Sequence, residues 1–205
     1  VDEYDLTPYL KEGENLLAIE VAGYNVPNFY IMNAPSFLQA EVTADGKVIA
    51  ATTTGKWNKV AIPFEGAVLG QRVQNAPKFS FQRTYRELYK LEPGYNGWLT
   101  DAKSPLFVPS KLEETDRKNL IERRVKYPDY TIRYATDTLP NNIFKFECNS
   151  TGFLGAKFEV RTPSKVAFIW DELLTDGQIK RRMSFDGRME FELAPGEYVI
   201  ESFEP

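Results

Sequence analysis

The sequence predicts an all-β protein built from β-sandwiches, and three observations lead to that class. Short apolar or alternating segments recur at close spacing along the 205 residues, as expected for strands that are at least half-buried. Helix-period stretches are few, because only 113–124 and 84–91 show one, and we favour a strand for 84–91. Dipeptides typical of tight turns separate many of the segments, namely Asp45-Gly46, Asp176-Gly177, Asp186-Gly187 and Pro195-Gly196.

The first segment, residues 4–24 (YDLTPYLKEGENLLAIEVAGY), predicts a helical turn followed by a strand. Thr7 can cap the turn with its hydroxyl, Pro8 suits the first helical position, and Gly13 suits a left-handed residue at the end. The run 16–22 is apolar and partly β-branched, which is typical of a buried strand. Because such a strand needs neighbours on both sides, they must come from downstream, from another chain or from a missing upstream segment, and we favour the upstream segment.

The other predicted strands follow in chain order. They are 37–42, 48–53, 59–62, 73–91, 130–134, 143–148, 153–160, 166–170, 179–185, 189–193 and 198–203. Alternation over 79–91 places several aromatic residues, including Tyr89, on the same face as Leu91, which predicts a long strand with an aromatic side. The stretch 91–109 is rich in Pro and Gly, and composition alone places a domain boundary near residue 100.

Composition excludes several classes of function. The net charge is −4, with 25 basic and 29 acidic residues, which argues against a nucleic-acid-binding protein. The densest basic stretch, 117–126, is interrupted by acidic residues and is typical of a solvated face. No run approaches the roughly 18 apolar residues that a membrane-spanning helix needs.

The chain has no histidine, and Cys148 is its only cysteine. An internal disulfide, a thiolate metal cluster, histidine-ligated zinc and the histidine-dependent catalytic triads are therefore excluded. Any catalysis would depend on carboxylates, Tyr, Lys or a bound ion.

An acidic stretch follows the predicted strand 166–170 and contains Asp171, Glu172 and Asp176. Because successive strand residues point to opposite faces, Asp171 and Glu172 cannot by themselves form the facing carboxylate pair of a glycosidase. We favour a polar turn in which a carboxylate accepts hydrogen bonds from loop amides. A bound calcium ion on these oxygens is the alternative.

Aromatic residues in loop-like surroundings are candidates for a sugar-binding platform. They are Tyr24, Tyr30, Tyr95 and Trp98. Packing in a core or between domains is the favoured alternative, since aromatic side chains dominate both.

Several segments, taken in order, resemble bacterial α-L-rhamnosidases. They are 4–24, PSFLQAEV (35–42), FQRTYRELYKL (81–91), WDELLTDG (170–177) and APGEYVIESFEP (194–205). The resemblance implies a partial galactose-binding-like jelly roll with an extended arm in residues 1–128, and a second β-sandwich domain in 129–205. It also implies that missing jelly-roll strands precede the chain and that a helical barrel with the catalytic acid and base follows it.

The resemblance therefore implies the non-catalytic β-sandwich portion of an α-L-rhamnosidase-like glycoside hydrolase. No catalytic residue is carried over to this sequence, whose expected partners are the barrel, the missing strands and a rhamnose-containing glycan. A periplasmic or secreted location fits such a protein better than a cytoplasmic one. The alternatives are a self-standing carbohydrate-binding module and a structural or adhesive pair of β-sandwiches.

Overall fold

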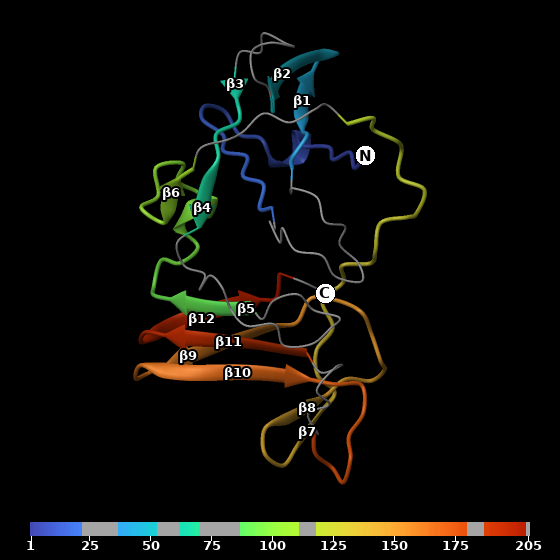
Figure 1. Cartoon of the computed structure of the whole chain (residues 1–205), viewed down its shortest axis with the longest axis vertical. Helices are drawn as coiled ribbons and strands as arrows, with labels where there is room; N and C mark the ends of the chain where they lie inside the picture. Colours follow the sequence, from blue (N-terminus) through green and yellow to red (C-terminus); the bar gives the residue numbers. More distant parts are fainter. Residues whose placement is uncertain (22–36, 53–61, 70–86, 111–117, 180–186, 204–205) are drawn as a thin grey trace. The chain divides into compact units, whose positions relative to one another are not determined.

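The structure is a computed structural model of the chain (Figure 1), and it describes residues 1–21, 37–52, 62–69, 87–110, 118–179 and 187–203. These residues are nearly all-β, with several small sheets and two short 3-10 turns, η1 (Thr7–Tyr9) and η2 (Gly97–Leu99). The predicted all-β class is thus confirmed. A helix long and apolar enough to cross a membrane is not found among the described residues.

The chain divides into two compact units. Unit 1 contains the described residues up to position 69 together with those in 96–126. Unit 2 contains 87–95 and the described residues from 127 onward. The first strand of unit 2 is therefore separated in sequence from the rest of that unit.

The described residues of unit 1 form two small sheets. The first has the order β1-β2-β3, formed by β1 (Glu41–Ala44), β2 (Lys47–Ala51) and β3 (Ile62–Pro63). The second pairs β4 (Ala67–Leu69) with β6 (Phe107–Pro109) in antiparallel fashion. Asp45 and Gly46 connect β1 to β2 with φ values of 50° and 71°, as a two-residue hairpin turn requires, which confirms the predicted turn.

The predicted helical turn exists as η1, but Thr7 does not cap it. Thr7 is the first residue of the turn, Leu6 is the residue before it, and no side chain caps the turn from that position. The Thr7 N–H instead donates to Asp5 Oδ1 at 2.9 Å. The hydroxyl prediction was wrong because Thr7 lies inside the turn, whereas a capping side chain belongs to the residue before it.

The loop after η1 is closed by Asn15. Its Oδ1 accepts the Lys11 N–H at 3.0 Å, and its Nδ2 donates to the Lys11 carbonyl at 2.9 Å. Gly13 lies inside this loop with φ of 92°, so the left-handed conformation predicted for it is confirmed, although the helical turn that it was expected to end already ends at Leu10. The "GEN" sequence therefore encodes a local loop.

Residues 16–21, the described part of the predicted first strand, are not a strand. Their backbone is irregular, and none of the described strands pairs with them. The side chains of Leu16, Leu17, Ile19 and Val21 are 41 to 46% exposed. The prediction was wrong for these residues because an apolar segment becomes a buried strand only when neighbouring strands cover it.

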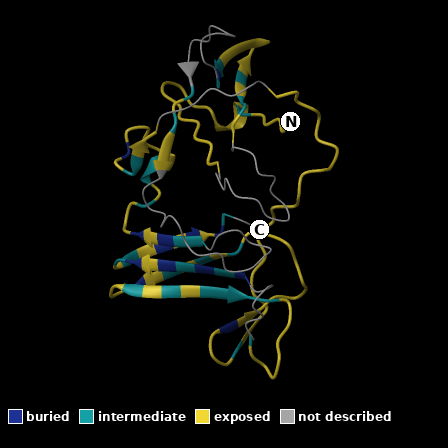
Figure 2. Ribbon diagram, in the orientation of Figure 1, coloured by how far each residue is buried: buried dark blue, intermediate teal, exposed yellow. Residues whose placement is uncertain are grey.

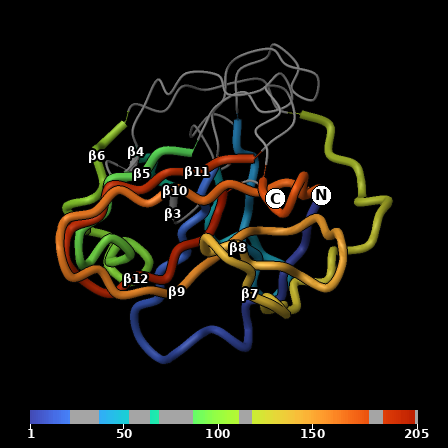
Figure 3. Tube along the Cα trace, turned by 90° about the horizontal axis from the view of Figure 1, so that it is seen from below, coloured from blue at the N-terminus to red at the C-terminus, as the bar shows by residue number. Residues whose placement is uncertain are grey.

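Unit 2 is built around two sheets (Figure 3). The first has the order β10-β11-β5, formed by β5 (Glu87–Leu91), β10 (Ser164–Trp170) and β11 (Gly187–Leu193). β10 and β11 are antiparallel, whereas β11 and β5 are parallel. The second sheet pairs β9 (Gly155–Val160) with β12 (Gly196–Glu201), and β7 (Asp137–Leu139) and β8 (Ile143–Lys145) form a separate hairpin.

The core of unit 2 lies between these two sheets, where the buried residues gather (Figure 2). The first sheet contributes Tyr89, Leu91, Met189, Phe191 and Leu193, and the second contributes Val160, Tyr198 and Ile200. In β5 the predicted alternation is confirmed, because Tyr89 and Leu91 are buried and Lys90 is exposed. Burying each large apolar side chain contributes about 1.5–3 kcal/mol, so these residues dominate the stability of unit 2.

Other predictions failed where alternation was not matched by a covering sheet. Residues 130–134 are irregular, and Tyr130, Ile132 and Tyr134 are 66 to 80% exposed. Residues 118–124, the described part of the helix-period stretch 113–124, are also irregular. The predicted strands 59–62, 73–91 and 179–185 lie partly or largely outside the described residues.

Trp170 packs directly over Gly187 in the first sheet. The two residues are paired across β10 and β11. A Cβ atom on Gly187 would overlap the indole ring, so only glycine leaves room for the ring there. Gly187 is therefore required by packing on the inner face.

We expect Gly187→Ala to destabilise the chain by about 1–3 kcal/mol, because the added methyl group must displace the Trp170 ring. Urea unfolding measures this difference. Gly152→Ala is the matched control, since a Cβ at Gly152 meets nothing within 4 Å. The same Gly187→Ala change in a Trp170→Ala background should cost much less, and an equal cost in both backgrounds would contradict the packing explanation.

Candidate functional site

Two carboxylates of the acidic stretch after β10 accept hydrogen bonds, one from the stretch itself and one from a different loop. Asp171 Oδ1 accepts the Leu173 N–H at 3.4 Å, and Glu172 Oε2 accepts Asn149 Nδ2 at 3.1 Å. These contacts match the turn chemistry that the sequence favoured for this stretch.

Asp176 and Gly177 form a two-residue turn. Their φ values are 53° and 70°, and Thr175 and Gln178 exchange backbone hydrogen bonds of 2.9 and 3.1 Å across it. Asp176 is thereby held at the tip of a small hairpin. Within the described ranges no group of three or more His, Cys, Asp or Glu side chains is arranged to hold a metal ion.

Tyr95 is half-buried and packs against the core of unit 2. Its ring centroid lies 5.5 Å from that of Tyr198. Its hydroxyl donates to the Val199 carbonyl at 2.5 Å and accepts the Val199 N–H at 3.0 Å. The ring and the hydroxyl are both used in contacts within the protein.

Trp98 belongs to unit 1, where it lies in η2. Its ring is half-buried and meets Phe107 of β6 edge to face, with centroids 6.3 Å apart. The other two predicted platform residues, Tyr24 and Tyr30, lie outside the described residues.

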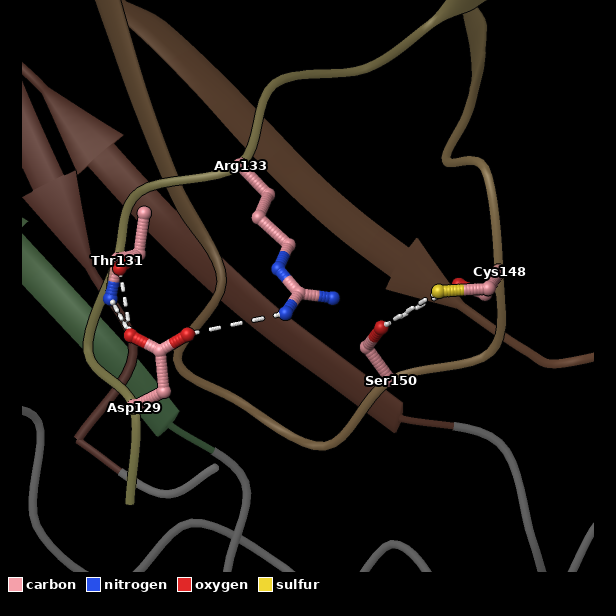
Figure 4. A network of polar contacts seen from close by, with 5 residues as sticks. All are labelled: Asp129, Thr131, Arg133, Cys148 and Ser150. Carbon is pink, nitrogen blue, oxygen red and sulfur yellow. Dashed lines mark hydrogen bonds and ion pairs between the residues drawn. The ribbon is translucent and has the colours of Figure 1, made fainter. Parts of the chain in front are cut away.

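Two small polar contacts lie in the exposed loops of unit 2 (Figure 4). Asp129 Oδ1 accepts both the N–H and the hydroxyl of Thr131, at 2.9 and 2.5 Å, and Arg133 lies 3.9 Å from the other carboxylate oxygen. The hydrogen bonds from Thr131 are the main reason that the pKa of Asp129 is lowered. Cys148 Sγ lies 3.4 Å from Ser150 Oγ and forms the second contact.

Sequence reasoning missed an exposed aromatic pair in unit 2. The rings of Tyr130 and Phe153 are stacked, with centroids 6.5 Å apart and an interplanar angle of 29°. The two side chains are 66% and 46% exposed. Both residues were assigned to predicted strands from their alternation, although the Asp129-x-Thr131 turn signal beside Tyr130 favours a loop.

An open depression of about 320 Å³ lies at one end of the β10-β11-β5 sheet. Its charged lining includes Lys90, Lys165 and Glu192, which stand next to one another in the register of the three strands. Lys165 Nζ lies 2.6 Å from Glu192 Oε1. The row has two positive charges and one negative, and Glu92, which also lines the depression, balances them, so the depression favours neither a strongly anionic nor a strongly cationic ligand.

The ion pair in this depression shifts the titration of both groups. The hydrogen bond and the charge of Lys165 lower the pKa of Glu192, and Glu192 in turn raises the pKa of Lys165. The lowered carboxyl pKa means that this pair is fully formed above the ordinary Glu value of 4.5 and is lost as the pH falls through the folded-state value.

Part of the basic stretch 117–126 is neutralised within unit 1. Arg123 Nε and Nη2 lie 2.5 and 2.6 Å from the two carboxylate oxygens of Asp2, in a two-pronged pair. The hydrogen bond from Arg123 is the main cause of a lowered pKa for Asp2. This arginine is therefore engaged in a contact that fixes the start of the chain.

Comparison with known proteins gives no match to this chain among protein-family models, curated proteins or solved structures.

Proposed function

We propose that this chain is the non-catalytic β-sandwich portion of an α-L-rhamnosidase-like glycoside hydrolase, in which it scaffolds a catalytic barrel. The proposal depends on where two of the segments that resemble α-L-rhamnosidases lie in unit 2. WDELLTDG (170–177) puts Trp170 against the core and ends in the two-residue turn. APGEYVIESFEP (194–205) contains β12 and the buried Tyr198. Segments that form core and turns suit a scaffold.

In this proposal residues 1–128 form part of a galactose-binding-like jelly roll, and 129–205 form the second sandwich. The exposed apolar side chains in residues 16–21 support a jelly roll whose other strands come from the parent protein. The two sheets of unit 2 share one core, which supports a sandwich, and β5 from residues 87–91 adds a strand to it from outside 129–205.

The proposal that the catalytic residues lie in a barrel outside this chain can be tested directly. We expect this 205-residue chain to release no nitrophenolate from 4-nitrophenyl α-L-rhamnopyranoside above the buffer rate. The protein translated from the complete reading frame that contains the chain should hydrolyse the same substrate. Turnover by the chain alone, or a complete protein without rhamnosidase activity, would contradict the proposal.

A self-standing carbohydrate-binding module is the second candidate, and the exposed Tyr130–Phe153 pair favours it. Stacked rings that face solvent offer flat apolar surface to the C–H faces of a sugar ring. This candidate needs no barrel.

For this second candidate we expect saturable binding of a rhamnose-containing oligosaccharide in calorimetric titration. Tyr130→Ala should weaken it by about tenfold or more, equivalent to ~1.4 kcal/mol, because the stacking surface is lost. Tyr134→Ala is the control, since Tyr134 is 80% exposed and lies in the same loop. Equal affinity of the Tyr130 variant and the wild type would remove the pair from consideration.

A further inference from the structure

The outer edge of β12 is occupied by a tyrosine hydroxyl. Tyr95 Oη donates to the Val199 carbonyl at 2.5 Å, and the Val199 N–H donates to the same oxygen at 3.0 Å. One side-chain atom therefore engages both backbone polar groups of a strand residue, as the backbone of a neighbouring strand would do.

The register of β12 shows which residues face this edge. Ser202 donates its N–H to the Leu154 carbonyl at 2.8 Å, on the side where β9 lies. Backbone groups of successive strand residues point to opposite sides, so those of Val199 point away from β9. The same alternation turns the backbones of Glu197 and Glu201 toward the outer edge.

Tyr95 is held in place by the turn that follows β5. Its N–H donates to the Glu92 carbonyl at 3.0 Å, and Gly94 between them has φ of 89°, as position three of a type II turn requires. Pro93 lies so close to Gly196 that a Cβ there would be 2.8 Å from the proline ring. The contact between the Tyr95 and Tyr198 rings adds to this turn, so both the backbone and the ring of Tyr95 hold its hydroxyl against Val199.

We propose that Tyr95 closes the β12 edge against pairing with β12 of a second copy of this chain. An open edge strand offers unpaired N–H and C=O groups to other strands, and Val199 lies near the middle of β12, where Tyr95 occupies both groups. Antiparallel pairing of two β12 strands about Val199 would need the two groups that the hydroxyl occupies.

The exposed glutamates on β12 add a second obstacle to the same pairing. In that arrangement Glu197 of each copy would stand directly opposite the glutamate at position 201 of the other. Like charges placed opposite each other on neighbouring strands are destabilising. The hydroxyl blocks the hydrogen bonds and the carboxylates oppose the approach. The inference is independent of the proposed function, because it concerns only contacts within unit 2.

Tyr95→Phe removes the hydroxyl oxygen and keeps the ring that packs against Tyr198. We expect this variant to shift from monomer toward dimer with rising concentration in sedimentation velocity, relative to the wild type. Adding Glu197→Gln and Glu201→Gln to Tyr95→Phe should move the shift to lower concentration. Hydrogen exchange of the Val199 amide should be faster in dilute Tyr95→Phe than in the wild type.

Three controls make the result specific. Tyr130→Phe, which removes a hydroxyl from an exposed tyrosine in unit 2, should sediment as the wild type does. Val199→Pro added to Tyr95→Phe removes the edge N–H and should abolish the dimer. The Glu197→Gln/Glu201→Gln variant with Tyr95 intact should not self-associate, because the hydroxyl still closes the edge.

The proposal is overturned by a folded Tyr95→Phe variant that sediments as the wild type at every concentration, or by a dimer that survives Val199→Pro. Self-association of the double glutamine variant with Tyr95 intact would also overturn it. That last measurement does not depend on the Tyr95→Phe protein folding.

Discussion

The hydroxyl of Tyr198 donates to the Ala194 carbonyl at 2.8 Å and also lies 3.3 Å from the Leu91 carbonyl. Only 1% of Tyr198 is exposed, so these contacts are buried. The Ala194 N–H donates to the same Leu91 carbonyl at 3.1 Å. Leu91 ends β5 in one sheet, Tyr198 lies in β12 of the other, and Ala194 lies between β11 and β12. A buried hydroxyl without an acceptor costs about 1–3 kcal/mol. The crossing from β11 to β12 avoids this cost because it brings the Ala194 and Leu91 carbonyls to the Tyr198 hydroxyl. A tyrosine bonded to a backbone carbonyl a few residues upstream at such a crossing is a feature of β-sandwich corners.

The neighbouring contacts depend on that junction. Tyr95 reaches the edge of β12 because its ring rests against Tyr198 and because its turn begins directly after Leu91. Burial is concentrated in unit 2, whereas Ala51 and Ser104 are the buried residues among the described part of unit 1. A unit with so little buried surface gains stability from further strands, which agrees with the proposed role of unit 1 as part of a larger jelly roll.

Local signals in the sequence predicted the all-β class, the turns at 45–46 and 176–177, and the buried alternation of Tyr89 and Leu91. They could not predict that β5 pairs in parallel with β11, where Leu91 stands beside Leu193, because that pairing joins residues far apart in the chain. The same limit explains why 16–21 and 130–134 were predicted as strands, since periodicity shows what could be buried and not what covers it. The sequence singled out Tyr95 as a candidate for a sugar-binding platform, whereas its contact with Val199 follows from tertiary register and could not be predicted from it.

Equilibrium unfolding of Tyr198→Phe as a function of pH tests most directly whether the buried hydroxyl joins the two sheets. Burial raises the pKa of Tyr198 above its ordinary value of 10.0, so its stabilising effect is present below pH 10.0 and is lost as the pH rises through the folded-state value. At neutral pH the free energy of unfolding of the variant should be about 1–3 kcal/mol lower, because the Ala194 carbonyl loses the hydroxyl that donates to it, whereas the Leu91 carbonyl keeps the Ala194 N–H. Above pH 10.0 the difference between the variant and the wild type should shrink. A variant as stable as the wild type at neutral pH, with the same alkaline profile, would contradict the account.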